Sequence, residues 1–263
     1  MRLVGSAPHW LAKGDAAEFA LPENLDELRQ KLAQFRIDVN VVPKANRRKR
    51  LLIADMDSTM IEQECIDELG VVAGLGSKIK AITIRAMRGE IDFADALKER
   101  VGLMAGLDAK VIDTIMRDRI TLMPGGKTLV TTMKAHGAYT ALVSGGFRQF
   151  TSKVAAHLGF DTNEANDLII ENGKLAGKVA EPILGKEAKL AALNHLSLVN
   201  GLTPTEAIAV GDGANDIPML QAAGMGVALH AKPKVQEAVP LCINHSDLTA
   251  LLYLQGYSHK EFV

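Results

Sequence analysis

Residues 51–59 read Leu-Leu-Ile-Ala-Asp-Met-Asp-Ser-Thr and place two carboxylates directly after a four-residue apolar run. A short apolar run of this kind is typical of a strand that is buried on both faces of a parallel sheet. Side chains alternate along an extended chain, so Asp55 and Asp57 are expected to project together from the carboxyl edge of that sheet. Open α/β sheets bind ligands at this edge. Because two adjacent anions repel, the pair predicts a bound cation or a carboxyl group that keeps its proton.

Further apolar segments alternate with helical segments from residue 50 onward. The predicted strands are residues 51–54, 139–143, 207–210, 227–229 and 241–243. This alternation predicts an α/β fold built on a doubly wound parallel sheet, Rossmann-like in architecture. The dipeptide Asn172-Gly173 lies between two short segments outside this pattern and predicts a two-stranded hairpin.

Two regions depart from the alternation. Residues 60–123 have helical periodicity and no convincing strand, which predicts a small helical cap inserted after the first strand and lying over its carboxyl end. Residues 1–45 combine a helical pattern with the alternating sequence 37–41, which predicts a small αβ appendage too short to bury a good core alone. Residues 46–59 and 124–263 are then predicted to form the core domain.

Composition excludes several classes of protein. The 263 residues are 48% hydrophobic with a formal net charge of -1, which argues against a dedicated nucleic-acid binder. No apolar stretch approaches a membrane span or a signal peptide, so we expect a cytoplasmic protein without a membrane partner. Cys65 and Cys242 are expected to be free thiols, and the basic residues 47–50 a solvated boundary. The seven histidines have no ligand spacing, and the oligomeric state stays open, a homodimer included.

A second group of polar residues follows the predicted strand 139–143. Residues 144–146 read Ser-Gly-Gly and lead into a helical segment. Glycines let the backbone approach an oxyanion, while the Ser144 hydroxyl and the first N–H groups of a helix can donate to phosphate. Taken alone, the same three residues are also an ordinary turn between a strand and a helix.

A third group, residues 211–216, reads Gly-Asp-Gly-Ala-Asn-Asp and follows the predicted strand 207–210. Asp212 at a strand end is typical of a ligand for a hard metal ion, although a turn with a helix cap at Asp216 is the alternative. Lys189 lies near the amino end of a helical segment, where the helix dipole disfavours a cation unless an anion lies nearby. A solvated surface lysine is the alternative, and Lys186 is the rival candidate.

In chain order, these segments resemble the four motifs of the haloacid-dehalogenase-like phosphohydrolases, over roughly residues 50–250. The resemblance implies that Asp55 is a nucleophile that forms an aspartyl-phosphate and that Asp57 is the general acid and base. It implies Mg²⁺ as the cofactor, with Asp55, the backbone carbonyl of Asp57, and Asp212 as ligands. Lys189 and Ser144 match the motifs that contact the phosphoryl oxygens.

The stretch from Asp55 through the acidic residues that follow it, together with residues 87–100, resembles the phosphoserine phosphatases within that superfamily. This resemblance implies hydrolysis of O-phospho-L-serine to L-serine and phosphate, the last step of serine biosynthesis. The implied substrate contacts are Glu64 for the ammonium, Arg100 for the carboxylate, Met87 and Phe93 as apolar walls, and also Ser144, Gly145 and Asn215. The resemblance further implies that Asp216 and Asn215 orient Lys189 and the water shell of the metal.

The helix spacing also allows a purely structural role for the cap residues. Phe93, Leu97 and Arg100 are spaced to share one helix face, so the guanidinium could simply extend from the edge of an apolar stripe into water. Glu64 could be a solvated helix residue. Other activities also stay open: a phosphatase or phosphotransferase for another amine-bearing monoester, a phosphoaccepting receiver domain, and a metal-dependent glycosyltransferase.

Overall fold

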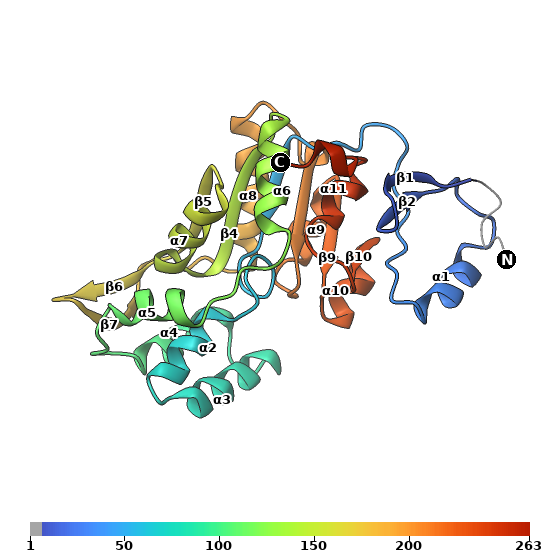
Figure 1. Ribbon diagram of the computed structural model, residues 1–263. Helices are drawn as coiled ribbons and strands as arrows, with labels where there is room; N and C mark the ends of the chain where they lie inside the picture. Colours follow the sequence, from blue (N-terminus) through green and yellow to red (C-terminus); the bar gives the residue numbers. More distant parts are fainter. Residues whose placement is uncertain (1–6) are drawn as a thin grey trace.

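A computed structural model describes residues 7–263 and has a six-stranded parallel sheet at its centre (Figure 1). Its order is β10–β9–β8–β3–β4–β5. The bounds are β3 Leu51–Ala54, β4 Tyr139–Phe147, β5 Thr162–Asn166, β8 Ala207–Gly211, β9 Met225–Leu229 and β10 Leu241–Ile243. The predicted doubly wound α/β fold is confirmed. Strand β5 was not predicted, because its sequence Thr-Asn-Glu-Ala-Asn has no apolar run.

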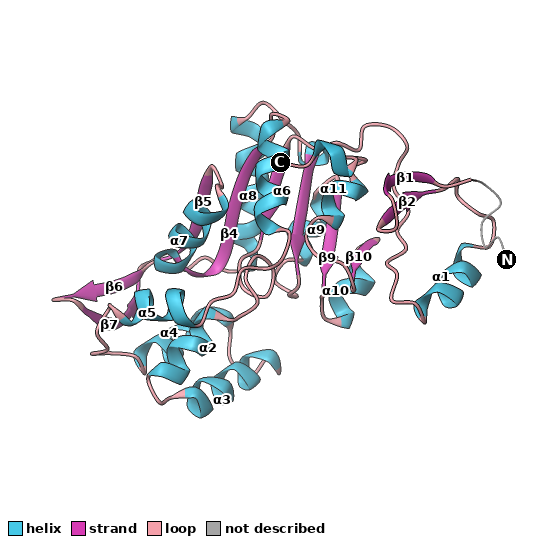
Figure 2. Cartoon of the chain, in the orientation of Figure 1, coloured by secondary structure: helices cyan, strands magenta, loops and turns pink. Residues whose placement is uncertain are grey.

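Helices cover both faces of this sheet (Figure 2). They are α6 Gly126–Ala135, α7 Arg148–Leu158, α8 Lys186–Val199, α9 Ile217–Ala222, α10 Pro233–Ala238 and α11 Ala250–Leu254. Leu52 of β3 packs in one apolar cluster with residues of α6, α7 and α11, whereas Leu51 and Ile53 pack in a second cluster with residues of α8, α9 and α10. Alternate side chains of the strand therefore serve opposite faces, which explains why all four are apolar.

The order of the strands reverses at β3. This strand pairs with β4 on one side and with β8 on the other. The chain runs from β3 to β4 and β5 on one side, then crosses to β8, β9 and β10 on the other. The loops that follow β3 and β8 therefore diverge at the carboxyl edge, which is the position where doubly wound sheets bind ligands.

Four helices lie between β3 and α6 in the chain and form a group beyond the end of β4 (Figure 1). They are α2 Cys65–Val72, α3 Gly76–Met87, α4 Phe93–Gly102 and α5 Val111–Asp118, and we call them the helical insertion. The predicted hairpin is present as β6 Leu168–Glu171 and β7 Lys174–Val179. Its Leu175 exchanges backbone hydrogen bonds of 2.8 Å with Gly106 and Leu107, so the hairpin extends the insertion rather than the central sheet. The domain boundaries drawn from the sequence stay a proposal.

The two chain segments that join the sheet to the helical insertion are hydrogen-bonded to each other. The Glu62 N–H donates to the Thr121 carbonyl at 3.0 Å, and the Met123 N–H donates to the Met60 carbonyl at 3.0 Å. The Thr121 N–H also donates to Gln63 Oε1 at 2.8 Å. We call residues 60–63 with 121–123 the linker ribbon. Both connections therefore run together as one narrow antiparallel pair.

Residues 7–45 differ from the prediction. Helix α1 (Leu25–Ala33) is present, but residues 37–41 form no strand, and the strands of this region are β1 His9–Ala12 and β2 Ala16–Glu18. The Asn40 side chain instead bonds both the N–H and the carbonyl of Cys242 in β10, each at 2.9 Å. The alternating polar residues thus pair with the sheet edge through their side chains. Residues 1–6 of the predicted appendage lie outside the described part of the chain.

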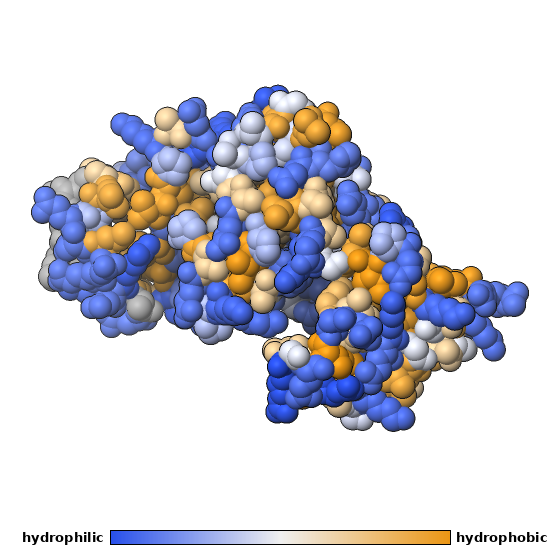
Figure 3. Space-filling model, turned by 180° about the vertical axis from the view of Figure 1, so that it is seen from behind, coloured by the Kyte–Doolittle hydropathy of each residue, from blue (hydrophilic) through white to orange (hydrophobic). Residues whose placement is uncertain are grey.

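Apolar side chains remain exposed on this region, among them Trp10, which is 50% exposed, and Leu21, which is 67% exposed. Figure 3 shows apolar surface there, on the left of the view from behind. Of the basic residues 47–50, Arg48 and Arg50 are exposed, as predicted, whereas Arg47 is half-buried. Arg47 and Arg48 form ion pairs with Glu18 and Glu261. Both cysteines are free, as predicted. Among residues 7–263, no helix has the length and apolarity that a membrane span requires.

Candidate active site

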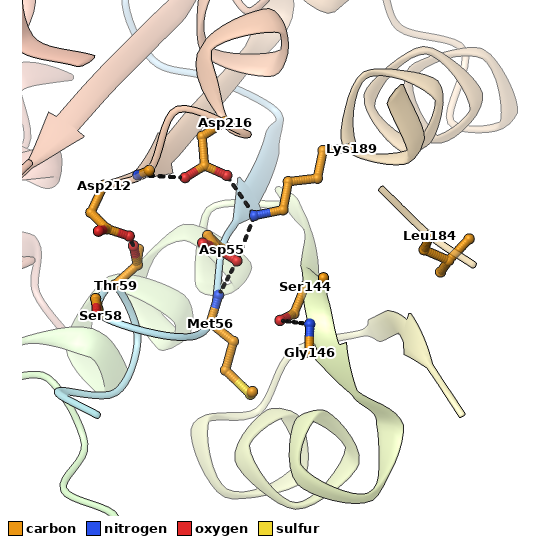
Figure 4. A network of polar contacts seen from close by, with 12 residues as sticks. Asp55, Met56, Ser58, Thr59, Ser144, Gly146, Leu184, Lys189, Asp212 and Asp216 are labelled. Atoms are coloured by element: carbon orange, nitrogen blue, oxygen red, sulfur yellow. Dashed lines mark hydrogen bonds and ion pairs between the residues drawn. The ribbon is translucent and has the colours of Figure 1, made fainter. Parts of the chain in front are cut away.

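A buried lysine joins two carboxylates at the carboxyl edge of the sheet (Figure 4). Lys189 Nζ lies 2.7 Å from Asp55 Oδ1, directly after β3, and 2.5 Å from Asp216 Oδ1, after β8. Burial opposes the charge of Lys189, but the two carboxylates outweigh it and raise the lysine pKa above its ordinary value. Lys186, the rival candidate, instead pairs with Glu187 at the surface.

Asp212 adds a third carboxylate to this cluster. Oxygens of Asp55, Asp212 and Asp216 lie within 4.8 Å of one another. Both Asp216 oxygens already have partners, because Oδ2 accepts a hydrogen bond of 2.9 Å from the Gly213 N–H while Oδ1 meets the lysine. A Cβ on Gly211 would lie 2.5 Å from the Asp216 carboxylate, so the strand must end in glycine.

The cluster carries more negative than positive charge. Burial and then the charge of Asp216 raise the pKa of Asp55 well above its usual range, although Lys189 opposes the shift. The same two causes raise the pKa of Asp212 to about 6. Buried carboxylates that outnumber their cations are stabilised by a bound metal ion, and their oxygens suit a hard divalent cation. The residues present therefore fit a divalent metal.

Beyond β3, which ends at Ala54, the chain turns, with the Met60 N–H donating to the Met56 carbonyl at 2.8 Å. Asp57 Oδ1 accepts a hydrogen bond of 3.0 Å from the N–H of Cys65, the first residue of α2. Burial, and second the charge of Glu64, raise the pKa of Asp57 to about 7. A neighbouring anion was the expected cause, but burial is the larger one.

Residues 144–146 prolong β4 instead of forming the turn that was the alternative. Ser144 is buried, and its Oγ accepts a hydrogen bond of 2.9 Å from the Gly146 N–H. A Cβ on Gly146 would lie 2.8 Å from Asp57 Oδ2, so glycine lets Asp57 approach this segment. A Cβ on Gly145 would lie 3.3 Å from the ring of Phe93 in α4. The helical insertion therefore contacts residues 144–146, the segment predicted to bind phosphate, through Phe93.

The other residues predicted to bind the substrate are more exposed and do not form one cluster. Glu64 precedes α2, is exposed, and accepts a hydrogen bond of 2.8 Å from Ser58 Oγ. Arg100 is half-buried, and its guanidinium donates to the Ala96 carbonyl at 3.1 Å and to Thr83 Oγ1 at 3.4 Å.

Burial lowers the pKa of Arg100, against the charges of Asp67 and Glu64. Within residues 7–263, Arg100 has no ion pair. Met87, at the end of α3, is 72% exposed, and Asn215 places Oδ1 over Gly213, 2.4 Å from where a Cβ would stand.

Three residues that contact the predicted site residues were given no role from the sequence. Thr59 is buried and its hydroxyl donates to Asp212 Oδ1 at 3.5 Å, Ser58 contacts Glu64, and Thr83 contacts Arg100. Ser58 and Thr59 stand within the opening stretch, directly after Asp57, and their hydroxyls were the available signal. Nothing local in the sequence indicated Thr83, because its partner lies seventeen positions away.

Comparisons with known proteins identify the family of the chain. Residues 52–221 match the family model of the haloacid dehalogenase-like hydrolases. A phosphoserine phosphatase of Lactococcus lactis is 45% identical over 81% of this chain and 99% of its own length. The chain belongs to the phosphoserine phosphatase family of these hydrolases. A Streptomyces coelicolor member is 40% identical over 89% of this chain, but the chain spans only 57% of that relative's length.

A solved structure of the family has a similar backbone. The phospho-aspartyl intermediate analogue of a phosphoserine phosphatase matches with a TM-score of 0.72 and 37% identity, over 78% of this chain and 98% of that one. Phosphatases of the superfamily generally use a divalent metal, which the acidic cluster fits. Family membership makes the chain a hydrolase of phosphoric monoesters.

Proposed function

We propose that this protein hydrolyses O-phospho-L-serine to L-serine and phosphate through a phosphorylated Asp55. The observation that carries the proposal is the buried contact of Lys189 with Asp55 at the switch point of the sheet, in a chain of this family. Phosphoryl transfer depends mainly on positioning and on neutralising charge, and this cluster supplies both.

Asp55 is the proposed nucleophile. One of its oxygens forms the new bond to phosphorus while the bond from phosphorus to the serine oxygen breaks. Lys189 and the Ser144 hydroxyl would contact the phosphoryl oxygens, with the Gly145 backbone beside them. Asp216 would hold Lys189 in place, since its own oxygens are taken by the lysine and by Gly213.

Mg²⁺ is the proposed metal, held by Asp55, Asp212 and the backbone carbonyl of Asp57. Asp212 suits this role because Thr59 is its only recorded side-chain partner among the described residues, at the long distance of 3.5 Å. When bound, the ion offsets the negative charge that gathers at the phosphoryl group.

Asp57 is the proposed general acid and base. In its protonated form it gives the proton to the serine oxygen as that group leaves. The resulting carboxylate then takes a proton from the water that attacks phosphorus and releases phosphate from Asp55. A pKa of about 7 allows both forms near neutral pH.

The helical insertion is the proposed source of selectivity. Glu64 would bind the ammonium group and Arg100 the carboxylate of the amino acid, while Phe93 and Met87 would exclude water. Phe93 already lies against Gly145, so a substrate held there would be in contact with both the insertion and the sheet.

The proposed setting is the cytoplasm, with a small-molecule substrate. Two free thiols, Cys65 and Cys242, fit a reducing compartment.

The test is an assay of purified protein with a panel of phosphomonoesters and added Mg²⁺. We expect phosphoserine to have the highest kcat/KM, and chelation of the metal to abolish turnover. Equal turnover of phosphoserine and sugar phosphates would contradict the proposed substrate. A phosphoryl group on Asp55 that persists for minutes would point instead to a receiver.

A further inference from the structure

Ser58 has an unusual backbone in the loop between β3 and α2. Its φ is +55°, in the left-handed region that few residues other than glycine adopt. The Ser58 N–H donates to the Gln63 carbonyl at 3.3 Å, and the Cys65 N–H donates to Asp57 Oδ1 at 3.0 Å. Such a conformation persists only where the surroundings determine it, and it is common at functional sites. The loop is therefore closed on itself directly beside Asp57.

The Ser58 hydroxyl points at Glu64. Its Oγ donates to Glu64 Oε1 at 2.8 Å, and it is the only side-chain donor recorded for that carboxylate within residues 7–263. Glu64 is otherwise exposed, and a free glutamate samples several rotamers. The hydrogen bond occupies Oε1 and leaves Oε2 available to a ligand.

We propose that Ser58 is a positioning residue for substrate selection. Its hydroxyl holds Glu64 so that the free oxygen meets a cationic group of the substrate at a fixed separation from Asp57. This inference rests on the proposed function, because it assigns the ammonium site to Glu64.

The covalent neighbourhood of Ser58 explains why this residue can do so. It follows Asp57 directly, so one peptide unit sets its position relative to the residue proposed to protonate the leaving-group oxygen. The left-handed backbone, in turn, sets the direction of its Cβ. A hydrogen-bond donor from another part of the chain could also hold the Glu64 side chain in one rotamer. It would not, however, fix the position of the Glu64 carboxylate relative to Asp57.

The test compares Ser58→Ala with wild type on phosphoserine and on phosphoglycolate, which lacks the ammonium group. Alanine keeps the Cβ and removes only the hydroxyl. We expect the KM for phosphoserine to rise about tenfold, the effect of one hydrogen bond to a charged group, with kcat nearly unchanged and phosphoglycolate unaffected. Ser58→Asn, which tolerates a positive φ and can donate to Glu64, should restore part of the selectivity.

Ser152→Ala is the matched control, because Ser152 is exposed and donates to Asn163 Oδ1 at 3.3 Å far from the site. If Ser58→Ala folds poorly, Ser58→Gly removes the same hydroxyl without backbone strain and should lose the same selectivity. Equal losses on both substrates, or no loss on either, would overturn the inference. A wild type that does not prefer phosphoserine would instead contradict the proposed function; the Ser58 variants are then judged on phosphoethanolamine against phosphoglycolate.

Discussion

The core end and the insertion end of the candidate site differ in how completely they are assembled. At the core end, Asp55, Lys189, Asp212 and Asp216 are buried, and Lys189 contacts Asp55 at 2.7 Å and Asp216 at 2.5 Å. Glu64 is exposed, and Arg100 bonds to its own helix and to Thr83. The groups proposed for catalysis are therefore already in contact without a ligand, whereas the groups proposed for recognition would gain their charged partners only when a substrate binds. Changes in the core should therefore affect every monoester, and changes in the insertion only those that carry the recognised group.

Asp55→Asn should have the largest effect. Without the nucleophile, turnover of phosphoserine and of p-nitrophenyl phosphate should both fall by about 10⁴-fold or more. Initial rates with both substrates check this. Asp113→Asn is the control, because Asp113 is exposed on α5 and pairs with Lys153 at 2.8 Å. Substantial activity of Asp55→Asn on either monoester would show that phosphorus is attacked by another group.

Lys189→Met should reduce kcat by about 10² to 10³-fold for both substrates. It should also destabilise the metal-free protein by about 3 to 5 kcal/mol, because Asp55 and Asp216 lose their buried cation. Denaturant unfolding with and without Mg²⁺ measures the second effect, which the metal should reduce. Lys186→Met should change neither quantity. An equal response of the two lysine variants would contradict the assignment.

Arg100→Ala should separate the two ends of the site. We expect kcat/KM for phosphoserine to fall about 10²-fold, because the substrate carboxylate loses its charged partner, while phosphoethanolamine, which has no carboxylate, is unaffected. Arg85→Ala controls for general damage to the helical insertion, since Arg85 pairs with Glu99 at 3.1 Å on the exposed side. A parallel loss on both substrates would mean that Arg100 supports folding and not recognition.

Glu64→Gln should have the smallest effect of these variants when activity is measured on a substrate without an ammonium group. Asp57 must be protonated to release the alcohol, so kcat/KM should fall as pH rises through its pKa of about 7. The charge of Glu64 helps to raise that pKa, and its removal should move the alkaline limb to lower pH by about half a unit. Profiles with phosphoglycolate test this, with Glu62→Gln as control. A limb that moves to higher pH would contradict the cause.

The sequence was sufficient to predict the parallel sheet and the positions of Asp55, Asp212 and Lys189 near its edge. Apolar strands that end in aspartate carry that information locally, since the carboxyl ends of parallel strands meet at one edge. The hydrogen-bond partner of Asp57 was not predictable in the same way. It is a backbone N–H eight residues later, in the first turn of α2 and outside the strand pattern.

Long-range pairing explains the other misses. Residues 37–41 alternate like a strand, yet Asn40 serves the β10 edge through its side chain, 202 positions away. Strand β5 is polar because it lies at the opposite edge of the sheet, where one side has no neighbouring strand. Hydrophobic patterns along the chain indicate which residues are buried. The structure of residues 37–41 and of β5 depends instead on a partner segment far away in the sequence.

The linker ribbon makes the helical insertion an exchangeable part. Because residues 60–63 and 121–123 bond to each other, the two connections cannot move independently of one another. The same pairing brings the two cut points for a graft side by side. An insertion taken from a relative with a different substrate would need to match this short pair, the backbone hydrogen bonds to Leu175 of the hairpin and the Phe93 contact, while the aspartates and the lysine of the host stay untouched.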